Sequence, residues 1–501
     1  MKQIKKDLVS NSYILAIDQG TTGSRCFIFD TKGVVIAKAY QEFTQYFPKP
    51  GWVEHDANEI WDSIVAVIKK AIALSKIDPK QIRAIGITNQ RETTVLWDRT
   101  THKPLTRAIV WQDRRTSEIC KRLKKFEPRV HQLTGLVLDP YFSATKINWA
   151  LQNIKGLRLK SSQGQLAFGT IDSWLIYKLT GGQSHVTDMT NASRTLIFDI
   201  TKKQWSTELL KIFNIPKNIL PKVLPSGALF GKTLKVPGLI DGIPILAVMG
   251  DQQAALYGQG CFNAGTIKNT YGTGCFMVLN TAGKKIISHK GLLTTLACDI
   301  QGKPVYALEG SVFIAGAVIQ WLRDQLKVIP NSSGADEAIK GLRDNDGVYF
   351  VPAFVGLGAP FWDAQARGII TGLTRGSNVK HIIRAARESM AYQTKDVFDL
   401  MQKESKLKIK TLAVDGGACQ SNFLMQFQAD LLQTKIVRPL MIDSTVAGVA
   451  HLAGITKGFW SVKDLAKMRG VDKIFRPRMS KTTAHEFYQG WQRAVRQAQT
   501  Q

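Results

Sequence analysis

The sequence predicts an α/β protein with two similar domains that face each other across a cleft. A length of 501 residues exceeds what one hydrophobic core usually serves, which indicates two domains. In the first half, strand patterns alternate with helix patterns, as in α/β folds. A second run of strand, Gly/Thr turn and strand begins near residue 265, in the order found near residue 13. We therefore expect a duplicated fold divided into residues 1–256 and 257–501.

Composition and charge narrow the class of protein. Hydrophobic residues at 44% and charged residues at 21% are ordinary for a soluble globular chain. The apolar start "YILAI" is too short for a signal-peptide core and no uncharged run could span a bilayer, so we expect a cytoplasmic protein without a membrane span. The six cysteines lack metal-ligand spacing and are expected to be reduced and mostly buried. The net charge of +28 is spread along the chain without a nucleic-acid motif, so we expect no nucleic-acid partner but a basic surface that attracts an anionic substrate.

The first domain begins with a meander of strands. Residues 13–43 predict three antiparallel strands, broken by a Gly/Thr turn at 18–23 and by "DTKG" at 30–33. Asp56 is the predicted N-cap of a helix over about 57–75, with Glu59 as its capping-box partner. The apolar stripe of this helix is predicted to comprise Ile60, Trp61, Ile64, Val65, Ile68 and Ile72. The segment "IRAIGITNQ" then predicts another strand.

The second domain opens in a related way. Residues 265–281, "GTIKNTYGTGCFMVLNT", predict strand, turn and strand, and further strands follow in "GLLTTLACD" and "PVYALEG". The turn Gly272-Thr273-Gly274 occupies the place that "DQGTTG" has in the first domain. Residues 412–432 predict a strand, the turn Asp415-Gly416-Gly417 and a helix starting near Ser421.

These glycine-rich turns are candidate phosphate sites. Glycine lets the backbone approach a phosphate closely, N–H groups and hydroxyls can donate to its oxygens, and Asp18 could bind Mg²⁺ through water. A single Gly/Thr turn is more often only a hairpin. Two such turns at equivalent places, however, suit the binding of one polyphosphate from both sides. Neither a P-loop nor the protein-kinase motifs are present.

Several residues could bind the molecule that accepts the phosphate, and each of them also has a purely structural interpretation. Asp251 follows an apolar strand, where it could take a proton from an attacking hydroxyl or only cap the next helix. Trp111 and Tyr141 could line the site or be ordinary core or surface aromatics. Arg91 and Glu92 stand between the apolar runs "AIGI" and "VLW". They form either a solvated turn or ion pair, or, if the strand ends at Asn89, two side chains that turn into the cleft.

Longer segments resemble one known family. In order along the chain they are "DQGTTGSR", "AIGITNQRETTVLWD", "LDPYFSATK", "VTDMTNASRT", "GDQQAALYGQ", "KNTYGTGCFM" and "ALEGSVFIAGAVIQWLRD". Together with shorter matches they extend from residue 13 to about residue 455 and resemble the FGGY carbohydrate kinases. The resemblance implies two ribonuclease H-like domains of the actin-like ATPase superfamily. It also implies transfer of the γ-phosphate of ATP to glycerol, giving sn-glycerol 3-phosphate in glycerol catabolism, with Mg²⁺, by a homo-oligomer (dimer or tetramer).

The same resemblance implies roles for individual residues. The residues that resemble acceptor ligands or walls are Arg91, Glu92, Tyr141, Asp251 and Gln252 for the hydroxyls, and Trp111 and Phe276 for the apolar face. Asp251 resembles the general base, and Asp18 the second catalytic carboxylate; both are expected near the metal ion. The residues that resemble nucleotide contacts are Thr21, Thr22, Gly23, Arg25, Thr273, Gly316, Gln320, Gly417 and Ser421.

Some positions depart from the family pattern. Gly23 stands where serine is usual, which removes a hydroxyl donor, and Ser421 replaces the usual asparagine near the adenosine. Arg387 and Ser444 also depart, outside the inferred site. Residues 227–244 lack both the Gly-rich, Arg-bearing loop for fructose bisphosphate inhibition and a histidine for phosphotransfer activation. We therefore expect neither control in this protein.

Two other functions are weighed against this one. The chain could be an FGGY kinase for another small polyol or a pentulose, against which the segments "NQRE" and "VWQDRR" count. It could also be a non-catalytic, actin-like scaffold, since one fold hosts many functions. The retention of Asp18, Asp251 and both Gly/Thr turns counts against the scaffold.

Overall fold

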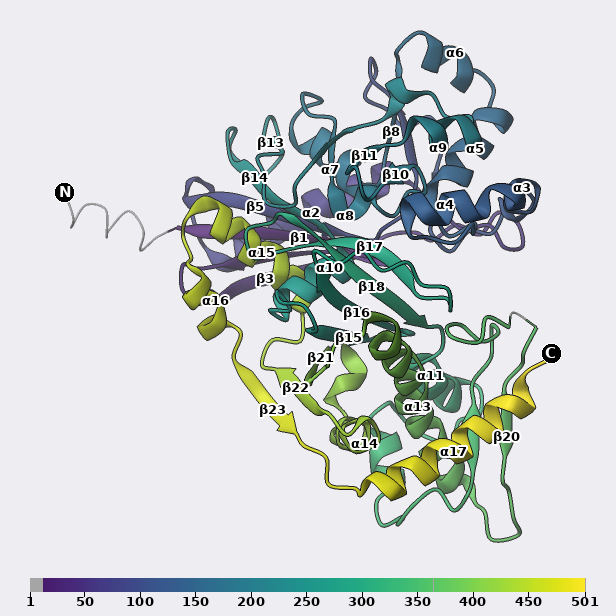
Figure 1. The fold of residues 1–501 in the computed structure, drawn as a ribbon. Helices are drawn as coiled ribbons and strands as arrows, with labels where there is room; N and C mark the ends of the chain where they lie inside the picture. The colour runs from purple at the N-terminus through teal and green to yellow at the C-terminus, as the bar shows by residue number, and fades with distance from the viewer. Residues whose placement is uncertain (1–11, 364, 501) are drawn as a thin grey trace.

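The computed structural model describes residues 12–363 and 365–500. The expectation that the chain has no signal peptide rests partly on residues 1–11, which lie outside the described residues. The apolar segment "YILAI" forms part of the first strand, β1. The fold is α/β with two large sheets, one in each half of the chain (Figure 1).

The first sheet has six strands in the order β13-β14-β5-β1-β2-β3. Their bounds are β1 Tyr13–Gln19, β2 Gly23–Phe29, β3 Val35–Glu42, β5 Ile82–Asn89, β13 Gly231–Lys232 and β14 Pro244–Gly250. Strands β1, β2 and β3 form the predicted antiparallel meander, while β5 and β14 extend the sheet in parallel to β1. The carboxyl ends of β1, β5 and β14 therefore meet at one edge of the sheet.

The second sheet repeats this topology. It has seven strands in the order β17-β18-β16-β15-β21-β22-β23. Their bounds are β15 Ile267–Tyr271, β16 Cys275–Ala282, β17 Leu293–Cys298, β18 Pro304–Val312, β21 Thr411–Asp415, β22 Lys435–Pro439 and β23 Val471–Phe475. Strands β15, β16 and β18 are antiparallel neighbours, and β21 and β22 follow in parallel, as β5 and β14 do in the first sheet. This confirms the predicted pair of domains with one topology, although β17 lies outside β18 rather than beside β16.

Helix α2 (Ala57–Ser75) covers one face of the first sheet. The predicted N-cap is confirmed, because the Asp56 side chain accepts from the N–H of Asn58 at 2.7 Å. The predicted capping-box role of Glu59 is wrong: its carboxylate accepts from the Thr44 N–H at 3.0 Å and from the Tyr46 hydroxyl, so tertiary partners replace the local one. Buried positions of α2 include Val67, which the predicted stripe omitted, whereas Val65 of that stripe is partly exposed.

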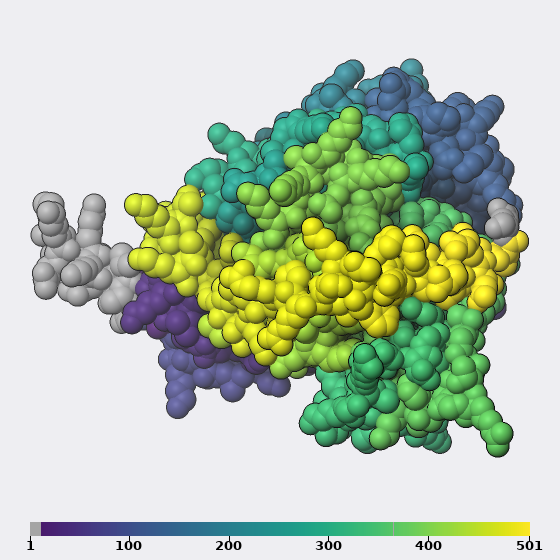
Figure 2. Space-filling view, turned by 60° about the horizontal axis from the view of Figure 1, so that its bottom comes forward, coloured from purple at the N-terminus to yellow at the C-terminus, as the bar shows by residue number. Residues whose placement is uncertain are grey.

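The opposite face of the first sheet is covered by α10 (Asp251–Gly258) and by α15 (Ser444–Lys457), which comes from the second half of the chain. Val446 and Val449 of α15 share a buried cluster with Ile14 and Ala16 of β1. Figure 2 shows the yellow-green segment around residue 460 against the purple N-terminal strands. A helix of the second half thus forms part of the core of the first.

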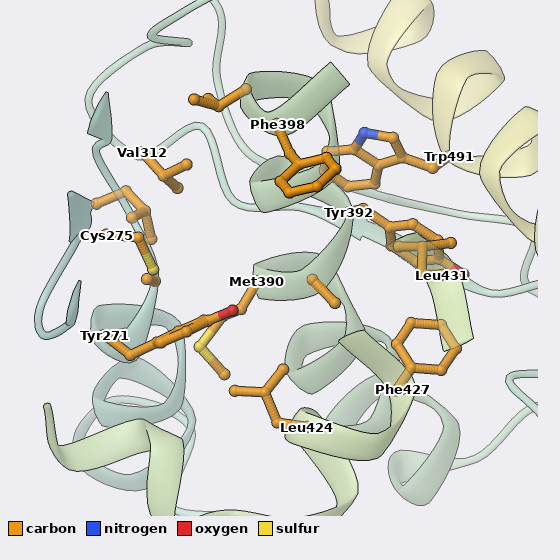
Figure 3. Packing of buried hydrophobic residues seen from close by; sticks show 14 of the residues in the cluster. Tyr271, Cys275, Val312, Met390, Tyr392, Phe398, Leu424, Phe427, Leu431 and Trp491 are labelled. Atoms are coloured by element: carbon orange, nitrogen blue, oxygen red, sulfur yellow. The ribbon is translucent and has the colours of Figure 1, made fainter. Parts of the chain in front are cut away.

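The second half has its largest core around one long helix. Helix α13 (Val379–Ser405) packs against β16, β18, α11 (Gly316–Asp324) and α14 (Asn422–Leu432). The C-terminal helix α17 (Lys481–Ala498) closes this core: its Trp491 ring stacks on Tyr392 of α13 with centroids 5.3 Å apart (Figure 3). The smaller helices and strands of this half are β19 Tyr349–Val351, β20 Ile369–Thr371, α12 Gly334–Ala338, η4 Gly417–Gln420 and α16 Val462–Met468.

The first half has further elements, some of which pack on its sheet, as α7 does against β5 and β14, and some of which extend beyond it, as α3 to α6 and α9 do at the upper right of Figure 1. The further helices of this half are η1 Pro79–Gln81, α3 Ser117–Leu123, η2 Lys124–Phe126, α4 Glu127–Thr134, α5 Ser143–Asn153, α6 Leu157–Ser162, α7 Ile171–Leu179, α8 Met189–Ala192, α9 Thr207–Ile212 and η3 Lys217–Ile219. Its further strands are β4 Glu54–His55, β6 Val95–Asp98, β7 Ala108–Ile109, β8 Leu166–Gly169, β9 Val186–Asp188, β10 Phe198–Asp199, β11 Gln204–Trp205 and β12 Lys222–Leu224.

Two expectations from composition can be compared with the structure. All six cysteines are free and buried, as predicted. Across residues 12–363 and 365–500, no helix combines the length and the apolar composition needed to cross a bilayer.

Candidate active site

The turn between β1 and β2 is a tight hairpin at the edge where the parallel strands end. The Gly20 N–H donates to the Gly23 carbonyl at 2.9 Å. Thr21 accepts from the Trp111 indole N–H at 3.0 Å, and the neighbouring Thr22 is exposed. The turn therefore presents backbone and hydroxyl groups beside an aromatic side chain of the predicted acceptor site.

The second sheet carries the matching turn between β15 and β16. The Gly272 N–H donates to the Gly274 carbonyl at 2.9 Å and closes this turn as the Gly20–Gly23 bond closes the first, with one residue fewer between the partners. The start of α11 is tied to this turn, because the Gly316 N–H donates to the Gly272 carbonyl at 3.0 Å. A Cβ at Gly316 would lie 2.6 Å from that carbonyl oxygen, so only glycine fits there. Gln320 lies exposed one turn further along α11.

The third glycine turn follows β21 and lies against the second. Gly416 has a φ of +83° and its Cα faces the Tyr271 carbonyl, where a Cβ would come within 2.4 Å of the oxygen. Gly417 is exposed, with open space where a Cβ would be. Ser421 caps α14 by accepting from the Leu424 N–H at 3.1 Å. The structure thus brings Thr273, Gly316 and Gly417 to one region.

Asp18, at the end of β1, belongs to a charged group that joins both halves. In the antiparallel register it pairs with Arg25 of β2, whose guanidinium lies 2.5 Å from the Asp18 carboxylate. Arg25 also donates to Asp443 at 2.9 Å, and the Thr445 hydroxyl donates to Asp18 at 3.2 Å. Asp443 and Thr445 lie at the start of α15, so this helix is bound to the residues that flank the turn between β1 and β2.

The space beside Gly23 is filled by neighbouring atoms, which leaves little room for a serine at this position. A Cβ at this position would lie 2.5 Å from the Tyr40 ring, 2.7 Å from its hydroxyl and 2.8 Å from the Gln41 carbonyl oxygen. Tyr40 lies on β3 opposite Arg25 and is 47% exposed. The tyrosine hydroxyl therefore stands close to where a serine side chain would begin.

Arg91 and Glu92 follow β5, which ends at Asn89. This end of the strand is what the hypothesis of two side chains turned into the cleft requires. A solvated turn is excluded, because the two residues are 3% and 1% exposed. Glu92 has a φ of +61°, and its Oε1 is 4.0 Å from Nε of Arg91. Both side chains have closer partners elsewhere, so they are not primarily an ion pair with each other.

The closest charged partner of Arg91 is Glu309 of β18. Arg91 Nη1 and Nη2 lie 2.5 Å and 3.0 Å from the two Glu309 oxygens, and Nε lies 3.2 Å from Asp251. Burial opposes ionisation of Glu309, but the guanidinium groups of Arg194 and Arg91 outweigh it and lower the pKa of Glu309 to about 2. The carboxylate is therefore charged at every pH at which the protein would work.

Asp251 begins α10, but Gly250 is the N-cap residue of that helix. The Asp251 side chain is 31% exposed and accepts from the Gln252 N–H at 2.7 Å. Burial raises its pKa, Arg91 and Lys268 partly offset the shift, and Asp18 adds to it. Asp251 is thus a reachable carboxylate of raised basicity beside a second carboxylate.

The remaining predicted acceptor residues are Trp111, Tyr141, Gln252 and Phe276. Trp111 meets Tyr141 edge to face with centroids 5.6 Å apart. Lys268 links Gln252 and Phe276: its ammonium group donates to the Gln252 side chain at 2.5 Å and to the Phe276 backbone carbonyl at 3.1 Å. Burial lowers the pKa of Lys268 to about 8, although nearby carboxylates, Asp415 first, oppose the shift. The structure thus joins Arg91 to Glu92 and Asp251, and Trp111 to Tyr141, while Lys268 links Gln252 to the backbone of Phe276.

The donor set around Asp18 and Asp251 fits a magnesium ion bound mainly by water and phosphate. Among the described residues, no group of three His, Cys, Asp or Glu side chains could enclose a metal. The two carboxylates are near enough for Asp18 to raise the pKa of Asp251. Mg²⁺ keeps several waters and needs only one or two carboxylates beside substrate phosphates.

Sequence reasoning missed four side chains of this site. They are Arg194, Lys268, Glu309 and Asp443. Three of them could have been noticed, because Arg194, Lys268 and Glu309 are each charged residues in a segment that is otherwise apolar or uncharged and is now seen to be buried. A buried charge without a nearby partner in sequence requires a distant one.

The order of the strands, the paired glycine turns and the carboxylates at the ends of the parallel strands define a class of protein. The FGGY family of carbohydrate kinases matches through its N-terminal domain over residues 13–258 and through its C-terminal domain over residues 267–456. The chain belongs to this family.

Within the family, the chain is similar to glycerol kinases. It is 53% identical to glycerol kinase 2 of Thermotoga maritima and 52% identical to the glycerol kinase of Bacillus cereus strain G9842, each over 96% of this chain and 98% of the relative. Among solved structures it resembles Plasmodium falciparum glycerol kinase with ADP, with a TM-score of 0.92 and 36% identity over 98% of this chain and 99% of the other.

Proposed function

We propose that this protein transfers the γ-phosphate of ATP to glycerol, giving sn-glycerol 3-phosphate and ADP in glycerol catabolism. The observation that carries the proposal is the convergence of Arg91, Glu92 and Asp251 beside Asp18, at the edge where the parallel strands end. Identity of about half to glycerol kinases over nearly the whole chain supports the same acceptor.

In this proposal the acceptor pocket has a polar and an apolar side. Arg91 supplies donors, Glu92 and Asp251 supply acceptors, and Tyr141 and Gln252 complete the set for the hydroxyl groups of a small polyol. Trp111 and Phe276 cover the carbon chain. A site built to hydrogen-bond several hydroxyls discriminates strongly against molecules that lack one.

Asp251 acts as the general base. It accepts the proton of a primary hydroxyl as that oxygen attacks the γ-phosphorus in line with the leaving oxygen of ADP. Its raised pKa makes it a better proton acceptor than an ordinary aspartate. Arg91 at 3.2 Å orients the carboxylate and offsets part of the rise in its pKa.

The nucleotide lies between the two halves. Thr21, Thr22, Gly23 and Arg25 contact its phosphates from the first half, and Thr273, Gly316, Gln320, Gly417 and Ser421 contact the nucleotide from the second. Asp18 and Asp251 would hold Mg²⁺ through water, and the ion supplies neutralisation of the charge on the phosphate oxygens when it is bound. Closure of the halves excludes water, which matters because ATP hydrolysis competes with transfer.

An assay of ADP release against several acceptors tests the proposal. The purified protein is given ATP and Mg²⁺ with glycerol, dihydroxyacetone, erythritol or xylulose, and the product is identified by ³¹P NMR. We expect the highest kcat/KM with glycerol and a single phosphomonoester product. Preference for xylulose or erythritol would overturn the choice of acceptor, and no turnover with any polyol would favour the scaffold.

Other expectations from the sequence stay predictions. They comprise the division near residues 256 and 257, the cytoplasmic location, the homo-oligomeric state and the absence of control by fructose bisphosphate or by histidine phosphorylation. We propose them together with the kinase activity. Gel filtration would test the oligomeric state, and assays with the effectors would test the absence of both controls.

A further inference from the structure

Glu309 is a fully buried carboxylate of the second half that reaches two arginines of the first. It lies in the middle of β18 and is 0% exposed. Oε2 is 2.5 Å from Nη1 of Arg91, and Oε1 is 3.0 Å from Nη2 of Arg91 and 3.1 Å from Nη2 of Arg194. One carboxylate thus binds a forked pair of bonds from Arg91 and a third contact from Arg194.

The two arginines lead from Glu309 to the carboxylates of the acceptor pocket. Arg91 Nε lies 3.2 Å from Asp251, and Arg194 Nε donates to Glu92 at 2.6 Å. The contacts therefore form a chain in the order Asp251, Arg91, Glu309, Arg194, Glu92. Its two ends are the general base and an acceptor ligand of the proposed function, and its centre is a residue that touches neither.

This geometry leaves Arg91 few other anchors. Besides Glu309 and Asp251, its guanidinium donates to the Gln253 side chain at 3.2 Å. Arg194 is 0% exposed, and neither its Nη1 nor its Nη2 has a hydrogen-bond partner within the described residues, so Nη2 meets Glu309 only as an ion pair at 3.1 Å. Without the Glu309 charge, two guanidinium groups would remain buried next to each other, which is strongly unfavourable. They would turn toward the remaining carboxylates, Glu92 and Asp251, which the acceptor needs.

We propose that Glu309 is a positioning residue for the acceptor: it neutralises and orients Arg91 and Arg194 so that Glu92 and Asp251 keep oxygens free for the substrate hydroxyls. The inference rests on the proposed kinase function and deepens it. Because Glu309 belongs to the second half and both arginines to the first, the acceptor ligands are correctly arranged only while the halves are in contact.

The test is the variant Glu309→Gln, which keeps the size of the side chain but replaces one acceptor oxygen by an N–H donor. We expect the KM for glycerol to rise at least about tenfold and kcat to fall, with the KM for ATP within about twofold of the parent. Glu309→Asp, which keeps the charge but is shorter, should show a smaller rise. ADP affinity measured by calorimetry should be unchanged.

A buried carboxylate away from the site serves as the control. Glu388 of α13 is 0% exposed and accepts from Arg384 at 2.7 Å and from Asn345 at 3.0 Å. Glu388→Gln should leave both KM values within about twofold even where thermal unfolding shows a loss of stability. A selective rise in the glycerol KM is therefore expected from Glu309→Gln and not from the same substitution at a buried carboxyl group outside the site.

The two proposals fail in different ways. A parent protein that phosphorylates none of the polyols would defeat the kinase function. An active parent whose glycerol KM is unmoved by Glu309→Gln, or moves together with the ATP KM, would overturn the positioning role. If Glu309→Gln does not fold, Glu309→Asp decides, and an unchanged glycerol KM in that variant would equally overturn it. Should the parent prefer another acceptor, the same KM comparison is made with that polyol.

Discussion

At the scale of single residues, the acceptor site depends on charges that restrain one another. Asp251 is exposed enough to meet a substrate, and Arg91 is buried and oriented by Glu309. A base that was fully paired would have a depressed pKa, whereas burial and the nearby Asp18 raise that of Asp251. Asp251 is therefore a better acceptor of a hydroxyl proton than an ordinary aspartate.

Replacing this base should abolish most of the turnover. Asp251→Asn keeps the shape of the side chain but cannot accept the proton, so we expect kcat to fall by at least about a hundredfold with folding retained. Steady-state kinetics and circular dichroism measure the two parts. The control is Asp30→Asn in the turn between β2 and β3, where the aspartate only accepts from the backbone of Lys32 and Val34. A near-normal rate for Asp251→Asn would exclude it as the base.

At the scale of elements, pairs of strands and helices determine which side chains the site can have. Tyr40 on β3 occupies the space beside Gly23 on β2, so a serine cannot be introduced at position 23 without a change in its neighbour. Trp491 and Tyr488 of α17 both donate to one buried carboxylate of α13, that of Asp396, at 2.9 Å and 2.6 Å. Each element pair can be tested on its own.

The β2–β3 pair predicts coupling between two substitutions. Gly23→Ser should reduce the free energy of unfolding by about 1 to 3 kcal/mol because the new Cβ overlaps Tyr40 and the Gln41 carbonyl. Adding Tyr40→Ala should restore part of this loss, with a coupling of at least about 0.5 kcal/mol, since only the Gln41 contact remains. Urea unfolding of both single variants and the double variant gives the coupling. Additive effects would contradict the contact.

The α13–α17 pair predicts a pH dependence of stability. Burial raises the pKa of Asp396 to about 7, while an aspartate in an unfolded chain has a pKa of about 4. Between these values the folded protein binds the extra proton, so this group's contribution to stability is present below about pH 4 and lost as the pH rises through about 7. Asp396→Asn should therefore show a smaller fall in unfolding free energy between about pH 5 and about pH 8 than the parent.

A neighbouring aspartate controls for this measurement. Asp399 lies one turn further along α13, pairs with Lys395 at 2.9 Å and has a 43% exposed side chain. Asp399→Asn should keep most of the pH dependence of the parent, because burial is the main cause of the raised pKa of Asp396 and Asp399 only adds to it. An equal pH dependence in Asp396→Asn and the parent would show that this carboxyl is not the source.

At the scale of the whole molecule, the halves are joined where the nucleotide is expected. Helix α15 lies on the first sheet although it belongs to the second half, and its crossing with α10 is so close that a Cβ at Gly448 would lie 2.0 Å from the Ala254 carbonyl oxygen. The first residues of this helix, through Asp443 and Thr445, bind Arg25 and Asp18. Packing between the halves and the geometry of the phosphate turn are therefore linked.

Gly448→Ala should separate the two helices. We expect a loss of about 1 to 3 kcal/mol in the free energy of unfolding and a rise in the KM for ATP, since Asp443 and Thr445 move with α15. Gly283→Ala is the control, because a Cβ there meets nothing within 4 Å. Urea unfolding and initial-rate kinetics are the measurements. Unchanged stability would contradict the close crossing, and lost stability with a normal ATP KM would contradict the link to the phosphate turn.

Local patterns were sufficient for much of the fold. The three-stranded meander, helix α2 with its Asp56 cap, and both Gly/Thr turns follow from turn residues and periodicity within short windows. Glu59 shows the limit of such reasoning: its spacing indicates a capping box, but Thr44 and Tyr46 are better partners in the folded chain. No local sequence pattern predicted the outer position of β17 or the packing of α15 on the first sheet either.

The sequence by itself determined the α/β class, the duplicated topology and the family, and it predicted a set of acceptor residues, because these depend on patterns and motifs that neighbouring residues carry. Only the tertiary structure decided how that set is held. Arg91 and Glu309 are 218 residues apart, and Arg25 and Asp443 are 418 apart. A buried charge in the sequence states that a partner must exist, since an unpaired one is too costly. Which partner it is depends on the packing of two sheets against each other, and that is a property of the folded chain alone.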